Sequence, residues 1–208
     1  CGQYQHHAPP PYSPGMEFAG EVAFAGKQVT ALREGDAVSS DIFHSGPRGY
    51  DRAYQDGGMA SFAVAPEAAL RPFPRADWSW HEACNFCGAY ETADHVLSKC
   101  ASVQPGEVVL IHGATGATGL AAVQLVAAMG ARSILTGGAD DKLATAAAEG
   151  GDSVLGVFNY RDSGRRMRDV VKELTGASGG VDVVYDGVGG AVTLEAVDEF
   201  EYVDPVDG

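Results

Sequence analysis

The hydrophobic residues in the second half of the chain alternate between short continuous runs and sets spaced as on a helix. The runs are rich in β-branched residues and bounded by turn residues, which predicts strands of a parallel sheet covered on both faces. They lie at residues 108–111, 133–136, 154–158 and 181–185. The helical sets lie between them at residues 120–129, 140–150 and 165–174, the last with Ser163 as its expected cap. This alternation predicts an α/β fold with a doubly wound parallel sheet, for which the usual strand order is 3-2-1-4.

The first part of the chain has short alternating segments separated by turn residues, which predict strands. The expected strands are residues 18–22, 29–32, 37–38 and 59–65, with residues 39–58 as an irregular loop and residues 1–15 as an extended, proline-rich one. Near Trp78 the pattern becomes helical. Asp77 or Ser79 can cap a helix through residues 81–84, and a second helix is expected over residues 90–98. We therefore expect a mainly β-barrel domain at residues 1–98 and the α/β domain at residues 99–208.

Three glycines spaced every third residue connect the strand at 108–111 to the helix at 120–129. They are Gly113, Gly116 and Gly119. Residues this small let the backbone approach a pyrophosphate, whose charge the free amides at the positive end of the helix can hold. The strand, turn and helix around them are the context that this motif requires. The pattern favours a dinucleotide site over an ordinary tight turn.

The end of the next strand bears on the choice of cofactor. Sites specific for NAD place a carboxylate there, which binds the ribose 2′-hydroxyl. This strand ends in Thr136, Gly137 and Gly138, with no acid, so a 2′-phosphate would meet no fixed repulsion. Lys142 can supply a positive charge, although Asp140 and Asp141 lie beside it. We expect NADPH rather than NADH.

Composition and charge narrow the function classes. The net charge is −14, and the densest basic run, at residues 165–168, is typical of a solvated helix face, so we expect no nucleic-acid partner. Four cysteines among 208 residues do not make a secreted disulfide framework. Polar residues interrupt every apolar run before it reaches membrane-spanning length. We expect a cytoplasmic protein with no membrane partner.

An ordered set of motifs carries a family resemblance. The motifs are Pro14-Gly15-Met16-Glu17-Phe18-Ala19-Gly20, Glu34-Gly35-Asp36-Ala37-Val38, Gly58-Met59-Ala60-Ser61-Phe62, Thr92-Ala93, Gln104-Pro105-Gly106-Glu107, the loop at 113–119, Asn159-Tyr160-Arg161-Asp162 and residues 181–190. Together they resemble the medium-chain dehydrogenase/reductase superfamily, in its zinc-independent quinone oxidoreductase (zeta-crystallin-like) branch. Residues 189–197 also resemble the prostaglandin and enone reductases of that branch.

The resemblance implies a GroES-like β-barrel domain and a Rossmann domain with NADPH in the cleft, delivering hydride to a quinone or an α,β-unsaturated carbonyl. It places a set of residues along the pyrophosphate: Thr115, Gly116, Ala117, Thr118 and Gly119. Gly138, Lys142 and Tyr160 would surround the adenosine 2′-phosphate, and Thr92 would lie near the nicotinamide. Three of these residues also have a structural alternative to the binding role. Thr92 would then be a residue on a helix surface, Lys142 a solvated helix charge and Tyr160 an aromatic residue at the end of a strand. A homodimer is compatible with the full-length family form.

Metal binding is not expected. A catalytic zinc in the related alcohol dehydrogenases needs a histidine directly before Glu17, where this chain has Met16, a poor ligand for Zn²⁺. Cys84 and Cys87 have metal-like spacing, but only Cys100 follows nearby. Small buried hydrophobic residues on a helix are the simpler interpretation of these cysteines.

The chain departs from the family pattern at both ends. It begins inside the barrel domain, and residues 198–208 are acidic and no longer follow the pattern, so both domains are expected to be partial. No catalytic acid or base is assigned, because the cofactor carries the hydride step. An enoyl-thioester reductase and a non-catalytic NADPH-binding fragment or interaction protein remain as alternatives.

Overall fold

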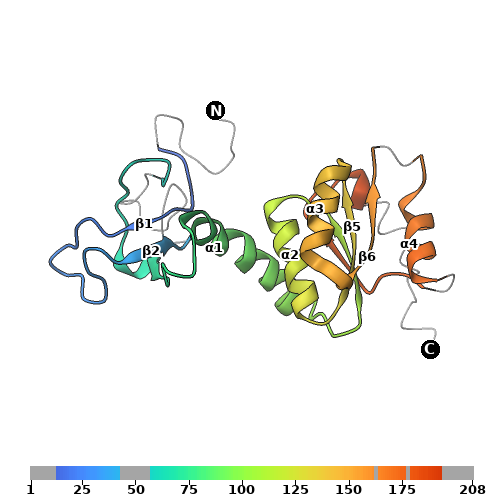
Figure 1. Cartoon of the computed structure of the whole chain (residues 1–208), viewed down its shortest axis with the longest axis horizontal. Helices are drawn as coiled ribbons and strands as arrows, with labels where there is room; N and C mark the ends of the chain where they lie inside the picture. Colours follow the sequence, from blue (N-terminus) through green and yellow to red (C-terminus); the bar gives the residue numbers. More distant parts are fainter. Residues whose placement is uncertain (1–12, 43–56, 162–163, 177–178, 194–208) are drawn as a thin grey trace. The chain divides into compact units, whose positions relative to one another are not determined.

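The computed structural model describes residues 13–42, 57–161, 164–176 and 179–193. The chain divides into two compact units, Cys1–Glu91 and Thr92–Gly208, which we describe one at a time (Figure 1). The expected domain boundary at residues 98 and 99 stays a prediction. Among the described residues no helix has the length and apolar character needed to cross a membrane.

The first unit contains a small antiparallel sheet in the order β1-β2-β3. Its strands are β1 (Ala19–Glu21), β2 (Ala37–Ser40) and β3 (Leu70–Pro72), with Gly20 opposite Val38 and Ser39 opposite Arg71. The strands expected at residues 18–22 and 37–38 are therefore confirmed. β3 follows a 3-10 helix, η3 (Glu67–Ala69), and was not expected. It is short and ends in a proline, which is typical of an edge strand with a weak sequence signal.

The strand expected at residues 29–32 is wrong, because a carboxylate binds its backbone amides instead of a neighbouring strand. Glu67 Oε1 accepts hydrogen bonds from the amides of Thr30, Ala31 and Leu32 at 2.9, 2.5 and 3.2 Å. These bonds lower the pKa of the Glu67 carboxyl, with the Ala31 amide as the main cause. The segment is a carboxylate-held turn that joins two distant parts of the first unit.

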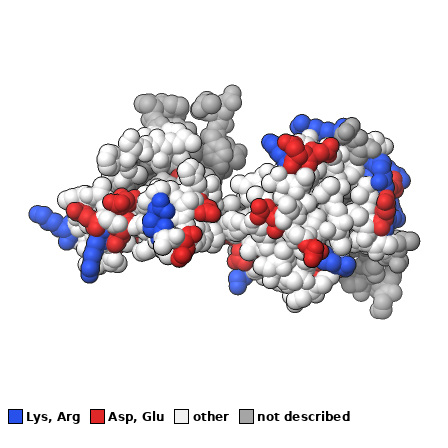
Figure 2. Space-filling model, in the orientation of Figure 1, with Lys and Arg blue, Asp and Glu red and all other residues white. Residues whose placement is uncertain are grey.

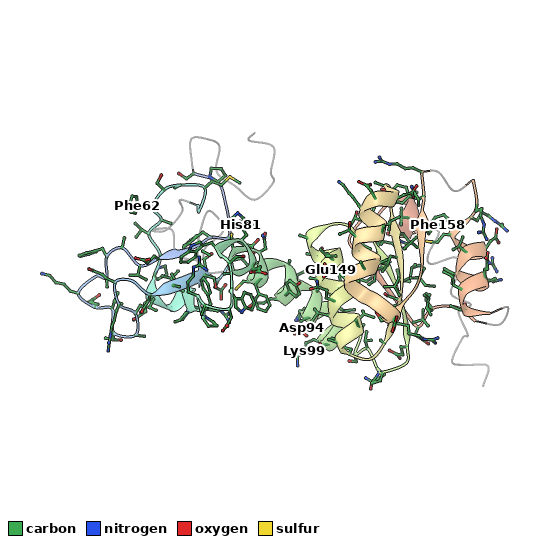
Figure 3. All side chains as sticks on the ribbon, viewed as in Figure 1. Phe62, His81, Asp94, Lys99, Glu149 and Phe158 are labelled. Carbon is green, nitrogen blue, oxygen red and sulfur yellow. The ribbon has the colours of Figure 1, made fainter. Side chains whose placement is uncertain are left out.

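The strand expected at residues 59–65 is also wrong. Its apolar side chains face solvent, with Met59 75%, Phe62 80% and Val64 75% exposed. Phe62 is labelled in Figure 3. The chain just before it is held by turn-like backbone bonds, from Gly57 N to Ser13 O and from Met59 N to Pro14 O. The apolar alternation here reflects surface residues rather than one face of a buried strand.

One continuous helical segment replaces the two helices expected around residues 81–98. It is α1 (Trp80–Asp94), continued by the π-helix η4 (His95–Cys100). Of the two candidate caps, Ser79 starts the helix: Glu82 N donates to Ser79 Oγ at 3.2 Å, and Ser79 N donates to Glu82 Oε2 at 2.7 Å. This reciprocal pair is a capping box. Gly88, in the helix interior, costs only about 1 kcal/mol against alanine and does not break the helix.

The second unit is a four-stranded parallel sheet in the order β6-β5-β4-β7. Its strands are β4 (Val108–His112), β5 (Arg132–Gly137), β6 (Val154–Asn159) and β7 (Val183–Asp186). All five residues of β4 are buried, as expected for the central strand. The expected strand order is confirmed.

Helices cover both faces of this sheet (Figure 1). Alternate residues of β4 point to opposite faces. Val108 and Leu110 pack with Phe158 against α4 (Met167–Thr175), while α2 (Ala117–Ala128) and α3 (Asp140–Gly150) contact β4, β5 and β6 from the other face. A short 3-10 helix, η5 (Gly151–Ser153), leads into β6.

The helix expected at residues 165–174 begins at Met167, after Arg166 as its N-terminal cap, and the expected cap Ser163 lies outside the described residues. Met167 is buried, while Arg165 pairs with Glu173 and Arg166 with Asp169 at the surface. The basic run is a solvated face, as expected. Acidic and basic side chains are interspersed on the face of the molecule that Figure 2 shows.

Candidate cofactor site

The glycine loop lies at the carboxyl end of the central strand, between β4 and α2. Gly113 has a φ of +64°, in the left-handed region that favours glycine. The chain then turns tightly: Ala114 N donates to Thr136 O at 3.0 Å, and Gly116 N donates to Gly113 O at 2.9 Å. Gly116 caps α2 in an extended conformation and offers no side-chain oxygen to the first amides of the helix. Those amides form a site suited to an anion.

Gly119 and Gly116 have different steric roles in this loop. A Cβ atom on Gly119 would lie 2.3 Å from Gly113 O and 2.8 Å from Ala114 Cα, both fixed backbone atoms. A Cβ atom on Gly116 would meet only Gly113 O, at an ordinary 3.4 Å. The helix therefore packs on the turn only because residue 119 is glycine. The space beside Gly116 is open, as a nearby ligand requires.

A second loop lies beside the glycine loop and is organised by Asp186, at the end of β7. Its Oδ1 accepts hydrogen bonds from Val188 N at 2.8 Å and Gly189 N at 3.0 Å, and its Oδ2 accepts one from Thr193 Oγ1. Burial raises the pKa of the Asp186 carboxyl, but these bonds and the nearby His112 outweigh it, so the pKa lies below its ordinary value. Asp186 was not predicted as a site residue, although an aspartate before a glycine-rich turn is a known signal for such side-chain-to-backbone bonds.

His112 lies beneath both loops, at the carboxyl end of β4. It is 1% exposed, and its Nδ1 lies 2.9 Å from Thr136 Oγ1 on the neighbouring strand β5. On the other side it is paired in register with Asp186. Val188 reaches back over the loop, since a Cβ on Gly113 would lie 3.1 Å from Val188 Cγ2. These contacts hold the ends of three adjacent strands and their loops together.

The residues expected around the 2′-phosphate are partly brought together. A Cβ on Gly138 would lie 2.8 Å from Tyr160 Oη, so the hydroxyl lies directly over the end of β5. Tyr160 is 52% exposed, and its amide donates to Gly137 O at 3.2 Å. Lys142 is exposed in the first turn of α3, four residues after Gly138.

The remaining expected residues divide between two places. Thr115, Ala117 and Thr118 lie in the glycine loop or the first turn of α2. Thr92 has an exposed side chain on α1, and its expected place near the nicotinamide stays a prediction.

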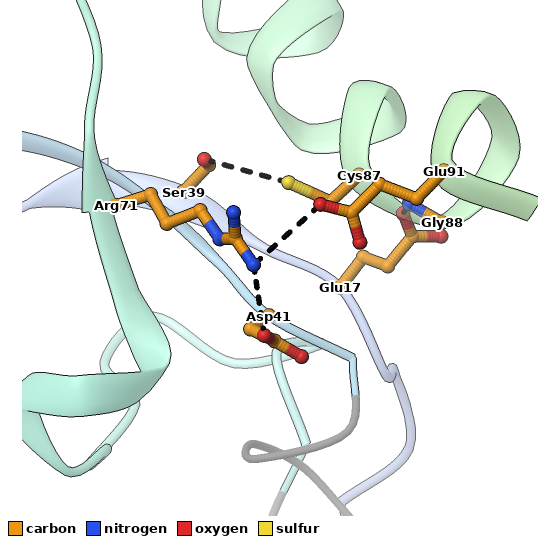
Figure 4. Close-up of polar contacts among 7 residues, drawn as sticks. All are labelled: Glu17, Ser39, Asp41, Arg71, Cys87, Gly88 and Glu91. Atoms are coloured by element: carbon orange, nitrogen blue, oxygen red, sulfur yellow. Dashed lines mark hydrogen bonds and ion pairs between the residues drawn. The ribbon is translucent and has the colours of Figure 1, made fainter. Parts of the chain in front are cut away.

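The first unit holds a separate polar cluster, shown in Figure 4, around the guanidinium of Arg71. Arg71 Nη2 lies 3.1 Å from Asp41 Oδ2 and 3.6 Å from Glu91 Oε1. The hydrogen bond to Asp41 is the main cause that raises the pKa of Arg71. Asp41 is only 7% exposed, so Arg71 compensates its buried charge. The cluster joins β2, β3 and α1 within this unit.

Glu17 and the two cysteines with metal-like spacing make other contacts. Glu17 Oε2 accepts the amide hydrogen of Gly88 at 2.8 Å, and a Cβ on Gly88 would lie 2.5 Å from that oxygen. Cys87 Sγ lies 3.9 Å from Ser39 Oγ, and burial raises the pKa of the Cys84 and Cys87 thiols. Within the described part of the chain, no three His, Cys, Asp or Glu residues are grouped to hold a metal ion. The contacts of Glu17 and Cys87 instead attach α1 to the residues around β1 and β2.

Two family models match the chain. The alcohol dehydrogenase GroES-like domain matches residues 1–75, and the zinc-binding dehydrogenase domain matches residues 117–200. With the parallel sheet and its glycine loop, these matches show that the chain belongs to the medium-chain dehydrogenase/reductase superfamily. The expected fold class, a Rossmann-type sheet preceded by a GroES-like domain, is confirmed.

The similar proteins include quinone oxidoreductases and an enoyl reductase. Quinone oxidoreductase-like protein 2 of Mus musculus is 35% identical over 198 residues, which are 94% of this chain and 51% of the relative. The crystal structure of Escherichia coli quinone oxidoreductase complexed with NADPH matches with a TM-score of 0.73 and 30% identity, over 93% of this chain and 55% of that one. The CurK enoyl reductase structure matches with a TM-score of 0.72 and 26% identity, over 91% and 51%. The chain spans about half the length of the curated relatives it matches.

Proposed function

We propose that this chain belongs to an NADPH-dependent oxidoreductase that transfers hydride to a quinone or another α,β-unsaturated carbonyl. The observation that carries the proposal is the contact of Gly119 with Gly113 at the carboxyl end of β4. It places the first amides of α2 beside an open glycine turn at the position where open parallel sheets bind ligands. The similarity to a quinone oxidoreductase complexed with NADPH supports the same cofactor here.

The preference for NADPH rests on the end of β5. Thr136, Gly137 and Gly138 present no carboxylate to a ribose 2′-hydroxyl, and Tyr160 Oη lies over Gly138. A phosphate there meets a hydroxyl donor and the positive charge of Lys142 rather than a fixed acid. Asp140, the nearest acid in the sequence, accepts a hydrogen bond from Asn159 Nδ2 at 2.7 Å.

In this proposal the protein mainly binds and orients the cofactor. The nicotinamide, when bound, supplies the hydride. The amides of α2 hold the pyrophosphate, and the Asp186-organised loop limits the space beside Gly113 with the exposed side chain of Val188. Thr92 is proposed to contact the nicotinamide end.

The test is NADPH binding by fluorescence titration, followed by NADPH oxidation with a panel of quinones and enones. We expect saturable binding and turnover with at least one of them. A chain that binds neither NADPH nor NADH would overturn the proposal. Binding without any oxidation would favour a non-catalytic cofactor-binding role.

A second candidate is an enoyl-thioester reductase, favoured by the similarity to the CurK enoyl reductase. Both reactions take hydride from the same cofactor to an acceptor that contains a carbon–carbon double bond conjugated with a carbonyl, so the cofactor site does not separate them. A crotonyl thioester supplied in place of a quinone distinguishes the two. Faster NADPH oxidation with the thioester than with any quinone would favour this candidate.

A further inference from the structure

A guanidinium lies over the end of β5 beside the residues expected at the 2′-phosphate. A Cβ on Gly138 would lie 2.9 Å from Arg161 Nε, as well as 2.8 Å from Tyr160 Oη. Arg161 and Tyr160 are adjacent in sequence, and both reach the same point above the backbone of Gly138. A hydroxyl and a guanidinium thus meet where the adenosine ribose of a Rossmann cofactor is bound.

Hydrogen bonds hold the segment that carries Arg161 in this position. Arg161 N donates to Asn159 Oδ1 at 3.0 Å, and Asn159 Nδ2 donates to Asp140 Oδ1 at 2.7 Å. Tyr160 N donates to Gly137 O, which ties the same segment to the end of β5. The amide of Asn159 occupies a carboxylate oxygen of Asp140, so the acid nearest to the site in sequence already has a hydrogen-bond donor.

The three arginines near the start of α4 differ in their ion pairs among the described residues. Arg165 and Arg166 pair with Glu173 and Asp169, whereas Arg161 forms no ion pair with an acid that the structure describes. Its Cζ lies 5.9 Å from the centroid of the Tyr160 ring. A guanidinium beside an aromatic ring keeps its planar set of donors directed, which suits two-point binding of a phosphate.

We propose that Arg161 binds the 2′-phosphate of NADPH and contributes more than Lys142 to the preference for NADPH over NADH. The inference rests on the proposed function. Arginine binds a phosphate through two parallel hydrogen bonds, whereas lysine acts as a point charge. Lys142 also follows two acids, Asp140 and Asp141, on an exposed helix turn. Arg161 is the cation whose side chain lies beside Gly138.

The experiment compares the affinities of NADPH and NADH for the 208-residue chain and four variants. Arg161→Gln should weaken NADPH binding by about tenfold or more, since a hydrogen bond to a charged group contributes 1.5–3 kcal/mol, roughly a 10- to 100-fold affinity change. NADH affinity should change less than about twofold, because NADH lacks the phosphate. Lys142→Gln should cost NADPH affinity less than Arg161→Gln. Arg165→Gln, a matched charge change at a residue paired with Glu173, should leave the ratio of the two affinities unchanged.

Arg161→Lys keeps the charge without the planar donors and should restore only part of the NADPH affinity. It also serves as the readout if Arg161→Gln fails to fold. Equal losses for both cofactors, an unchanged NADPH affinity, or full restoration by lysine would overturn the role of Arg161. Failure of the unaltered chain to bind either cofactor would instead overturn the proposed function, and this inference with it.

Discussion

A side chain on Gly119 would begin 2.3 Å from the carbonyl oxygen of Gly113, closer than non-bonded carbon and oxygen atoms approach. The helix that starts at Ala117 can therefore lie against the end of β4 only because residue 119 has no Cβ. Gly116, three residues earlier, has no such restriction. The two glycines of one motif are thus required for different reasons, and this difference can be tested.

We expect Gly119→Val to lower both stability and NADPH affinity, the affinity by more than about tenfold, because the loop must move away from its anion-binding position. Gly116→Ala should change the melting temperature little, since its Cβ meets only an ordinary contact and its φ of −85° suits alanine. It should still weaken NADPH binding by crowding the pyrophosphate. Thermal melts and fluorescence titrations of both variants test this pair. An unchanged NADPH affinity in Gly119→Val would remove the loop from the site.

Removal of the capping box of α1 should lower the stability of the protein. Ser79→Ala removes the oxygen that accepts the Glu82 amide hydrogen and should lower the free energy of unfolding by about 1 kcal/mol. Denaturant unfolding followed by circular dichroism measures the change. Ser61→Ala, at an exposed serine outside any helix, is the control and should be nearly neutral. Equal effects of the two substitutions would contradict the role of Ser79 as the cap.

The lowered pKa of Asp186 predicts how its loop responds to acid. Because the folded-state pKa lies below the ordinary value of 3.8, the carboxylate stabilises the folded state above that pH. Its contribution is lost as the pH falls from 3.8 through the lower folded-state pKa. Asp186→Asn should cost about 1–2 kcal/mol at neutral pH, since amide and hydroxyl donors lose a charged acceptor.

The measurement is the difference in unfolding free energy between the wild type and Asp186→Asn across the acid range. We expect this difference to shrink below pH 3.8, where the wild-type carboxyl becomes protonated. Asp152→Asn, at an exposed acid in η5, should show no comparable difference. A difference that persists unchanged in acid would mean that the charge of Asp186 is not the cause.

The outer edge of β7 leads us to expect that copies of this chain associate with one another. β7 is the last strand in the order β6-β5-β4-β7, and no further strand pairs with it among the described residues. Asp182 N donates to Val108 O on β4, so by alternation the amide of Val183 points away from the sheet. An unpaired apolar edge is a template for intermolecular pairing. The 208-residue chain should therefore form concentration-dependent oligomers in sedimentation experiments.

Val183→Pro should reduce this association without unfolding the sheet, because the substitution removes only an outward amide. Val184→Pro is the matched comparison. It removes an inward amide and should unfold the second unit. A monodisperse monomer at all concentrations would refute the prediction, as would a Val183→Pro variant that associates like the wild type.

The parts of the fold that could be predicted from the sequence are those in which a regular pattern of hydrophobic residues extends over many residues. The central strand is apolar without interruption, and the glycines at 113, 116 and 119 mark where it ends, so the position of the loop could be predicted. The strand order could be predicted because strands and helices alternate along the second half of the chain. The segments at 29–32 and 59–65 have a similar local pattern, but distant contacts decide their structure. Only the fold brings Glu67 to the amides of residues 30–32.

The candidate site divides in the same way. The glycine loop is local in sequence and was predictable. Asp186 also acts locally, on amides two and three residues ahead of it, but that signal was not used, whereas the Arg161 side chain lies beside the end of a different strand. Arg161 was visible in the Asn159-Tyr160-Arg161 motif, but its place over Gly138 depends on the pairing of β5 with β6. Gly88 could not be assigned a role either, since its contact with Glu17 joins residues 71 positions apart.

The helix α1 has a consequence for how the chain responds to a protease. The division between the two units falls between Glu91 and Thr92, inside this helix rather than in an extended linker. Proteases cleave extended backbone, and the peptide bonds around residue 91 are helical, with the helix continuing to Cys100. Chymotrypsin should therefore cut first after exposed aromatic residues outside regular structure, such as Phe62, rather than separate the two units.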